Sequence, residues 1–143
     1  MGYIKRAFTL VEILIVVVIL GILAAIVVPQ FTSAVTDASV ATTVNELQKI
    51  RRASEYYQFK NELSMPAVVA GDGTWGELVS GSGDYLKSPP TNAYVGGAKH
   101  QTIILGNAPD TEYQSEYAWI FDAATGDIWA GGFDENDEPL PKN

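Results

Sequence analysis

The chain has 143 residues, a formal net charge of −8 and no cysteine. This length suits a single small domain, and the lack of cysteine excludes a disulfide framework and a thiolate that could bind metal or act as a nucleophile. Segment 72–143 carries twelve acids against three bases, so charge-driven binding to nucleic acid is disfavoured and no such partner is expected.

The first predicted element is a membrane-spanning helix at residues 8–28. This run of 21 residues, apolar except near its start, would span roughly 32 Å as a helix, which matches the ~30 Å hydrocarbon core of a bilayer. Lys5 and Arg6 precede the run, and the next base is Lys49. The positive-inside tendency therefore places the N-terminus in the cytoplasm and the rest of the chain across the membrane.

An ordinary secretory signal peptide is the main alternative for this segment, with Thr32, Ser33 and Ala34 as a small-residue cleavage site. Two observations count against it. The apolar run is longer than the ~7–15 residues that are usual for a signal peptide. Glu12 also places a carboxylate inside the run, where it would not help a simple signal.

The residues on either side of the apolar run carry a resemblance to a known family. Lys-Arg-Ala-Phe-Thr-Leu-Val-Glu stands at 5–12, and Val-Pro-Gln-Phe ends the run at 28–31. Together they resemble the N-terminal signal of type IV prepilins and type II secretion major pseudopilins. The resemblance implies that prepilin peptidase cuts between Ala7 and Phe8, and that Phe8 is then N-methylated. Ala7 departs from the family pattern, because glycine normally precedes the cut.

Glu12 is the residue of this segment for which physical chemistry also suggests a function. The resemblance places Glu12 fifth and Pro29 twenty-second in the mature chain, and implies that both serve assembly. A carboxylate at membrane depth is unfavourable unless a partner neutralises it. Cleavage before Phe8 creates a cationic amine, and the amine of an entering subunit could pair with Glu12 of another. The alternative is an acid at the membrane surface, stabilised by the helix dipole or by water.

The next predicted element is an amphipathic helix at residues 32–61. Apolar residues recur at steps of three and four between Val40 and Tyr57, and most charged residues fall elsewhere on the helix. Asn61, followed by Pro66, favours a stop near this point. If this helix continues the preceding apolar one, their joint length is ~80 Å.

Pro29 lies near the junction of these two predicted helices. Proline removes a backbone donor and clashes with the preceding turn, so a bend or a stretch that melts is expected between Gly21 and Pro29. Alternatively, Pro29 separates two distinct helices where the chain leaves the membrane.

Residues 62–143 are predicted to form a head of loops and a small sheet. Glycines and prolines divide the first part of this segment into short pieces, among which Trp75–Val79 suits one helical turn. Gly126 suits the left-handed position of a hairpin turn. Three runs rich in β-branched and aromatic residues predict strands: Thr102–Leu105, Tyr117–Phe121 and Asp127–Ala130.

The predicted fold class is therefore α+β: a long N-terminal α-helix, membrane-spanning in its first half and amphipathic in its second, packed on a small antiparallel β-sheet. The apolar face of the amphipathic helix is expected to cover one face of the sheet. That sheet face is predicted to comprise Ile104, Trp119, Phe121, Ile128 and Tyr94. The expected division is a basic leader at 1–7, a transmembrane assembly helix at 8–31, the amphipathic helix at 32–61 and the head at 62–143.

Catalysis finds little support in the sequence. The single histidine, His100, lies in a predicted loop, and the chain lacks the common catalytic and nucleotide-binding motifs. We therefore expect neither enzyme activity nor an organic cofactor.

The C-terminal acidic cluster is a candidate metal site. Asp134, Asn136, Asp137 and Glu138 offer the hard oxygen ligands that calcium prefers, and the resemblance to major pseudopilins implies a Ca2+ site in a C-terminal loop. The spacing of these residues does not match an EF-hand. A solvated acidic tail is the alternative.

The resemblance implies that the chain is a structural subunit of a type IV pilus-like or type II secretion pseudopilus filament. Such a subunit forms a homo-oligomer, is cut by prepilin peptidase and is assembled by an inner-membrane platform. It would be a single-pass inner-membrane protein before assembly and part of a periplasmic or extracellular filament afterwards. The alternative is a monomeric extracytoplasmic binding domain that uses its apolar helix only as an anchor. Phe8, Glu12 and Pro29 favour the filament, because an anchor needs apolarity alone.

Overall fold

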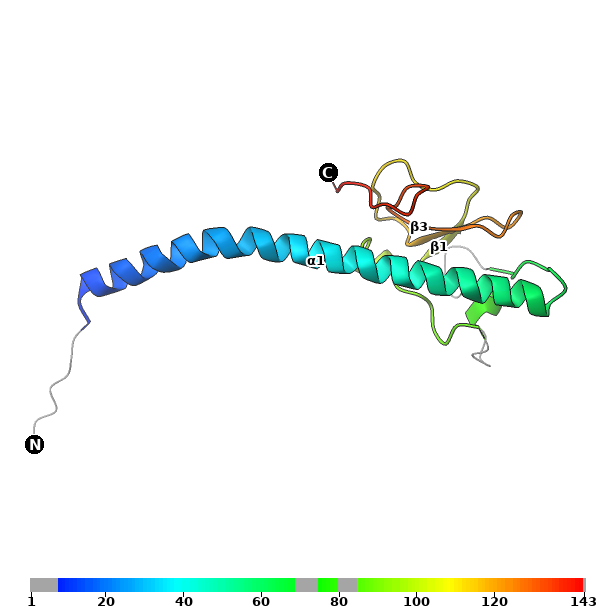
Figure 1. Cartoon of the computed structure of the whole chain (residues 1–143), viewed down its shortest axis with the longest axis horizontal. Helices are drawn as coiled ribbons and strands as arrows, with labels where there is room; N and C mark the ends of the chain where they lie inside the picture. The colour runs from blue at the N-terminus through cyan, green and yellow to red at the C-terminus, as the bar shows by residue number, and fades with distance from the viewer. Residues whose placement is uncertain (1–7, 69–74, 80–84, 143) are drawn as a thin grey trace, which may run out of the picture. The chain divides into compact units, whose positions relative to one another are not determined.

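The computed structural model describes residues 8–68, 75–79 and 85–142 (Figure 1). Its elements, in chain order, are α1 (Leu10–Lys60), the 3-10 helices η1 (Gly76–Val79) and η2 (Gly97–Lys99), and the strands β1 (Ile103–Leu105), β2 (Trp119–Phe121) and β3 (Ile128–Ala130). The chain divides into two compact units, of which the first ends at Asp37 and the second begins at Ala38. This is the α+β architecture that the sequence predicts.

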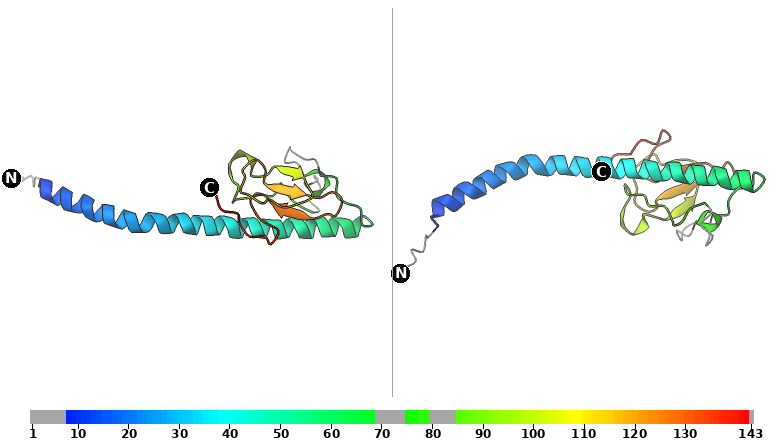
Figure 2. Two further views of the ribbon diagram at one scale, coloured as in Figure 1. Left: turned by 90° about the horizontal axis from the view of Figure 1, so that it is seen from above. Right: turned by 60° about the horizontal axis from the view of Figure 1, so that its bottom comes forward.

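The first unit contains the N-terminal part of α1. Helical geometry continues through Pro29, so the predicted melted stretch and the alternative of two separate helices are both wrong. Within this unit the helix curves gently (Figure 2). The Thr32 and Ser33 hydroxyls donate to the carbonyl oxygens of Val28 and Pro29, at 3.1 and 3.3 Å. Proline and such back-bonding hydroxyls are known causes of curvature in a helix that stays continuous.

The second unit packs the C-terminal part of α1 on the sheet, and both views of Figure 2 show the two lying side by side. Leu47 and Ile50 are fully buried, and they share the core with Trp119 and Phe121 of β2. The buried residues of α1 follow the spacing expected for one helical face: Thr43, Leu47, Ile50, Ala53, Ser54 and Tyr57. The predicted apolar face is therefore confirmed.

α1 ends at Lys60, as the sequence predicts. The Asn61 side chain donates to the carbonyl oxygen of Tyr57 at 2.8 Å, and the Leu63 N–H donates to that of Gln58 at 2.8 Å. Leu63 lies in the left-handed region, with φ 65°. The bond from Leu63 satisfies a carbonyl group that the end of the helix leaves without a helical partner, while the Tyr57 carbonyl oxygen also accepts from the Asn61 N–H at 3.0 Å.

The sheet is mixed, with strand order β1-β2-β3. β2 and β3 are antiparallel, as predicted, but β1 and β2 are parallel, so the prediction of a wholly antiparallel sheet is wrong. The connection 106–118 has about the dozen residues that a parallel pair requires. Asp110 anchors this connection, because its carboxylate accepts from the Tyr117 hydroxyl at 2.5 Å and from the Gly132 N–H at 2.7 Å.

The prediction that Ile104 of β1 belongs to the core is wrong by one position. Ile103 is fully buried, whereas Ile104, on the opposite face, is only partly buried. Leu105 shares the face of Ile103 but lies at the end of the strand and is 53% exposed. Successive side chains of a strand point to opposite faces, so a shift of one residue exchanges the faces. The other predicted core residues are confirmed as buried: Tyr94, Trp119, Phe121 and Ile128.

A buried amide joins the segment before η2 to the strands. Asn92 has no exposed surface. Its Nδ2 donates to the carbonyl oxygens of Ala118 and Gly131, both at 2.9 Å. Its Oδ1 accepts from the backbone N–H groups of Tyr94 and Val95, at 3.0 and 2.9 Å. The side chain thus satisfies four backbone groups that would otherwise lie unpaired in the core.

Candidate functional site

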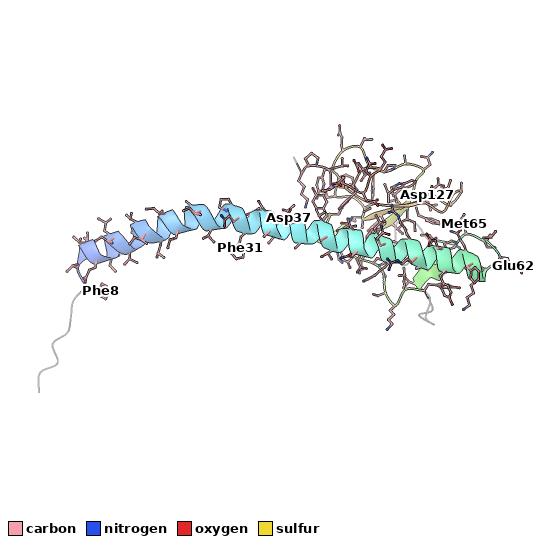
Figure 3. The ribbon with its side chains drawn as sticks, viewed as in Figure 1. Phe8, Phe31, Asp37, Glu62, Met65 and Asp127 are labelled. Atoms are coloured by element: carbon pink, nitrogen blue, oxygen red, sulfur yellow. The ribbon has the colours of Figure 1, made fainter. Side chains whose placement is uncertain are left out.

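The apolar part of the first unit is unusually exposed. Its large side chains between Phe8 and Val28 expose from 45% to 82% of their surface. α1 includes a window of 18 residues with a mean hydropathy of 3.3, and none of that window is buried. Figure 3 shows side chains projecting both above and below the helix between Phe8 and Phe31. By length and composition this segment can cross a membrane, and its surface calls for lipid or other apolar helices around it.

Thr9 and Glu12 form a capping box at the start of α1. The N–H and the hydroxyl of Thr9 donate to Glu12 Oε2, at 2.8 and 2.9 Å. In return, the Glu12 N–H donates to Thr9 Oγ1 at 3.2 Å. A Thr-x-x-Glu sequence before an apolar run is the usual signature of this motif, so Thr9 is a site residue that sequence reasoning missed although its signal was present.

The capping box fixes the direction of the Glu12 carboxylate. Both donors of Thr9 use the same oxygen, Oε2, and Oε1 has no donor among the residues that the structure describes. The carboxylate is therefore held towards the first residues of the helix with one oxygen still available. This arrangement can receive a cation from another molecule without first losing its contacts to Thr9.

The other predicted residues of this helix lie apart. Ala7, on the leader side of the predicted cut, lies outside the described residues, while Phe8 is 77% exposed. Pro29 lies 17 residues beyond Glu12, which corresponds to roughly 26 Å along the helix axis. Glu12 and Pro29 therefore do not belong to one local site.

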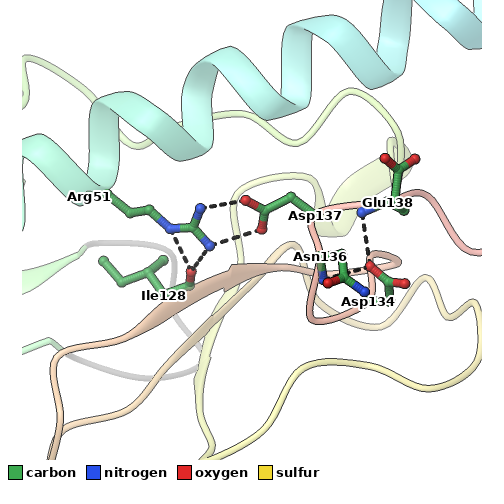
Figure 4. Close-up of polar contacts among 6 residues, drawn as sticks. All are labelled: Arg51, Ile128, Asp134, Asn136, Asp137 and Glu138. Atoms are coloured by element: carbon green, nitrogen blue, oxygen red, sulfur yellow. Dashed lines mark hydrogen bonds and ion pairs between the residues drawn. The ribbon is translucent and has the colours of Figure 1, made fainter.

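The C-terminal acidic cluster forms a tight turn, which we call the acidic turn, at Asp134–Glu138 (Figure 4). Asp134 Oδ1 accepts from the backbone N–H groups of Asn136 and Glu138, at 2.8 and 2.9 Å. The bond from the Glu138 N–H has the larger effect and that from the Asn136 N–H the smaller, and both hold the pKa of the Asp134 carboxyl below its usual value. A bridge between Phe133 and Pro139 closes the turn.

Arg51 of α1 contacts this turn. Its Nη1 donates to Asp137 Oδ2 at 2.5 Å, and its Nη2 donates to Asp137 Oδ1 at 2.9 Å. Nε and Nη2 also donate to the carbonyl oxygen of Ile128, at 3.2 and 2.9 Å. Sequence reasoning missed Arg51, because no local signal indicates a partner 86 residues away.

The four predicted calcium ligands do not converge. In the described ranges 8–68, 75–79 and 85–142, no three side chains of His, Cys, Asp or Glu are grouped so that they could hold a metal ion. Both oxygens of Asp137 face Arg51, and Figure 4 shows the Glu138 carboxylate pointing away from that of Asp134. As arranged, Asp134, Asn136, Asp137 and Glu138 do not fit a calcium ion.

A groove of ≈ 670 Å³ lies in the second unit, between α1 and segment 85–91. Its charged lining residues are Glu46, which pairs with Lys49, together with Arg52 and Lys87. This lining has no pairing of a nucleophile with a general base of the kind that catalysis requires. His100 lies elsewhere, after η2, with its Nδ1 2.5 Å from the carbonyl oxygen of Gly97.

Comparison with known proteins bears on the N-terminal part of the chain. Residues 4–28 match the family model of the prokaryotic N-terminal methylation motif. The chain is 48% identical over 57 residues to the type II secretion system core protein G of Pseudomonas aeruginosa. These residues are 40% of this chain and 40% of that protein. It is 38% identical over 60 residues to the core protein G of Pectobacterium carotovorum, covering 42% of this chain and 38% of that protein.

A second group of relatives has a different name. The chain is 40% identical over 55 residues to the type IV major fimbrial protein FimA of Dichelobacter nodosus, covering 38% of this chain and 35% of that protein. The match thus spans about two fifths of the length of the curated relatives. No solved structure matches the chain.

Proposed function

We propose that this chain, which carries the N-terminal methylation motif and has pseudopilins and type IV fimbrial proteins as relatives, is a structural filament subunit and not an enzyme. The filament would be a type II secretion pseudopilus or a type IV pilus-like fibre. The observation that carries the proposal is an apolar helix, exposed along its length, that begins with a capping box presenting one acid.

The first step in this proposal is processing at the membrane. The segment 8–31 inserts with its N-terminus in the cytoplasm, because the bases Lys5 and Arg6 precede it. Prepilin peptidase removes residues 1–7, and the new amine of Phe8 is methylated. The chain is then an inner-membrane protein with its head on the far side of the membrane.

The second step is assembly of the homo-oligomer on an inner-membrane platform. Apolar helices of many copies cover one another, so the apolar surface stays out of water when the subunit leaves the lipid. The methylated amine of an entering Phe8 pairs with Oε1 of Glu12 in an earlier copy. A repeated contact between two different surfaces builds an open helical fibre, which is then periplasmic or extracellular.

The role of Glu12 is tested with two variants as the sole subunit. Glu12→Val removes both the capping carboxylate and the charge, whereas Glu12→Gln can keep the capping contact and removes the charge alone. Both are expected to insert and fold but to reduce filament yield at least tenfold. Asp37→Val is the matched control, because Asp37 is an exposed acid of the same helix beyond the apolar segment.

Membrane fractionation and electron microscopy of sheared filaments separate insertion from assembly. Normal filament yield from both Glu12 variants would remove the proposed role of the acid. A chain that stays in the membrane without filaments, with or without Glu12, would instead support a monomeric anchored domain.

A further inference from the structure

The acidic turn places four carboxylates on five consecutive residues. Like charges this close repel one another, so a folded turn of this composition requires a cation or hydrogen-bond donors nearby. Lys142 is close in sequence, but its Nζ donates to the carbonyl oxygen of Tyr94 at 2.6 Å and lies 4.2 Å from the centre of that ring. Among the residues that the structure describes, Arg51 is the base that forms an ion pair with the turn itself.

The Arg51 guanidinium binds the two kinds of oxygen that calcium also uses, a carboxylate and a backbone carbonyl. Its planar guanidinium donates to both carboxylate oxygens of Asp137 and to the carbonyl oxygen of Ile128 in β3. The two side chains are only 30% and 23% exposed, so solvent and salt screen this pair less than a surface ion pair.

The backbone of the turn is shaped for this contact. Asp137 has φ 61°, in the left-handed region that Asp and Asn tolerate better than most residues. Its N–H donates to the Asp134 carbonyl oxygen at 3.2 Å, and the Asp134 carboxylate caps the same turn. Hydrogen bonds within the turn thus present the Asp137 carboxylate to α1.

We propose that the Arg51 guanidinium is the resident cation of the acidic turn, and that the head of this chain takes no divalent cation there. The Arg51 side chain of the same chain stabilises the turn, so the head keeps the same stability whether or not calcium is present. This differs from the expectation that follows from the resemblance to major pseudopilins. Because Arg51 and Asp137 both belong to the second unit, their contact stabilises the head whether or not the subunit is in a filament.

The test is thermal unfolding of the full-length chain in non-ionic detergent micelles, in millimolar calcium and in chelator. The three tryptophans, at 75, 119 and 129, all lie in the head and report its unfolding by fluorescence. The natural chain is expected to have the same midpoint in both solutions. Arg51→Met is expected to lower the midpoint by about 5 °C or more in chelator, because it leaves a half-buried carboxylate without its partner.

Arg52→Met is the matched control, since Arg52 is exposed on the same helix and has no ion pair among the described residues. It is expected to change the midpoint by less than about 2 °C. Arg51→Lys keeps the charge without the planar fork and should lie between the natural chain and Arg51→Met, which covers the case in which the Met variant does not fold.

Two results would overturn the inference. One is a midpoint of the natural chain that rises by several degrees in calcium and loses that rise in Asp134→Ala. The other is an Arg51→Met midpoint equal to that of Arg52→Met.

Discussion

Asn92→Ala is expected to destabilise the head more than any exposed substitution. The buried Asn92 amide bonds four backbone groups, of which two keep another partner: the Ala118 carbonyl still accepts from Gly131, and the Tyr94 N–H still donates to Thr43. The Val95 N–H and the Gly131 carbonyl have no other partner among the described residues. Each such buried group costs about 1–3 kcal/mol, so the loss is about 4 kcal/mol.

The assay is thermal unfolding of the full chain in micelles, followed by tryptophan fluorescence. For a head of this size 1 kcal/mol corresponds to about 4 °C, so the midpoint should fall by about 15 °C. Asn45→Ala, at an exposed position of α1, is the control and should change stability by less than about 0.5 kcal/mol. An Asn92→Ala midpoint within 3 °C of the natural chain would refute the reasoning about unpaired backbone groups.

Three further predictions concern the processed N-terminus, the Glu77 carboxyl group and Gly126. Mass spectrometry of the subunit from filaments should find a chain that starts at N-methylated Phe8, and a subunit that retains Met1 or begins at Val35 would contradict this. The Tyr57 hydroxyl, at 2.6 Å, and then the Ala67 N–H lower the pKa of Glu77. Its contribution to stability is therefore complete above its ordinary pKa and is lost as the pH falls through the lower pKa of the folded state. Glu77→Gln should flatten the fall of the unfolding midpoint below pH 5, whereas an unchanged acid profile would exclude this cause. Gly126 has φ 83°, and an added Cβ would lie 2.9 Å from Met65 Sδ. Gly126→Ala should therefore cost about 1–2 kcal/mol by the same unfolding assay, and a neutral result would argue against the turn geometry.

The elements of this fold could be predicted from sequence where the signal is local. The helix face from Val40 to Tyr57 follows from spacing, and its end at Lys60 follows from the breakers beyond it. The left-handed conformation of Gly126, between β2 and β3, could likewise be predicted from the sequence. The Thr9 and Glu12 capping box also has a local signal, the Thr-x-x-Glu spacing before an apolar run.

The features that sequence reasoning missed depend on contacts between distant residues. The direction of β1 relative to β2 is set by the path of segment 106–118, which Asp110 fixes through Tyr117 and Gly132. The pairing of Arg51 with Asp137 depends on where the acidic turn meets α1. Neither follows from periodicity or from turn residues.

Electron microscopy of fibres from a strain in which this chain is the only pilin-like subunit tests the central proposal most directly. With an antibody against the head, the account predicts label along the full length of the fibres. Label confined to the membrane, in cells that process the chain and contain the assembly platform, would contradict the proposal that the chain is a filament subunit.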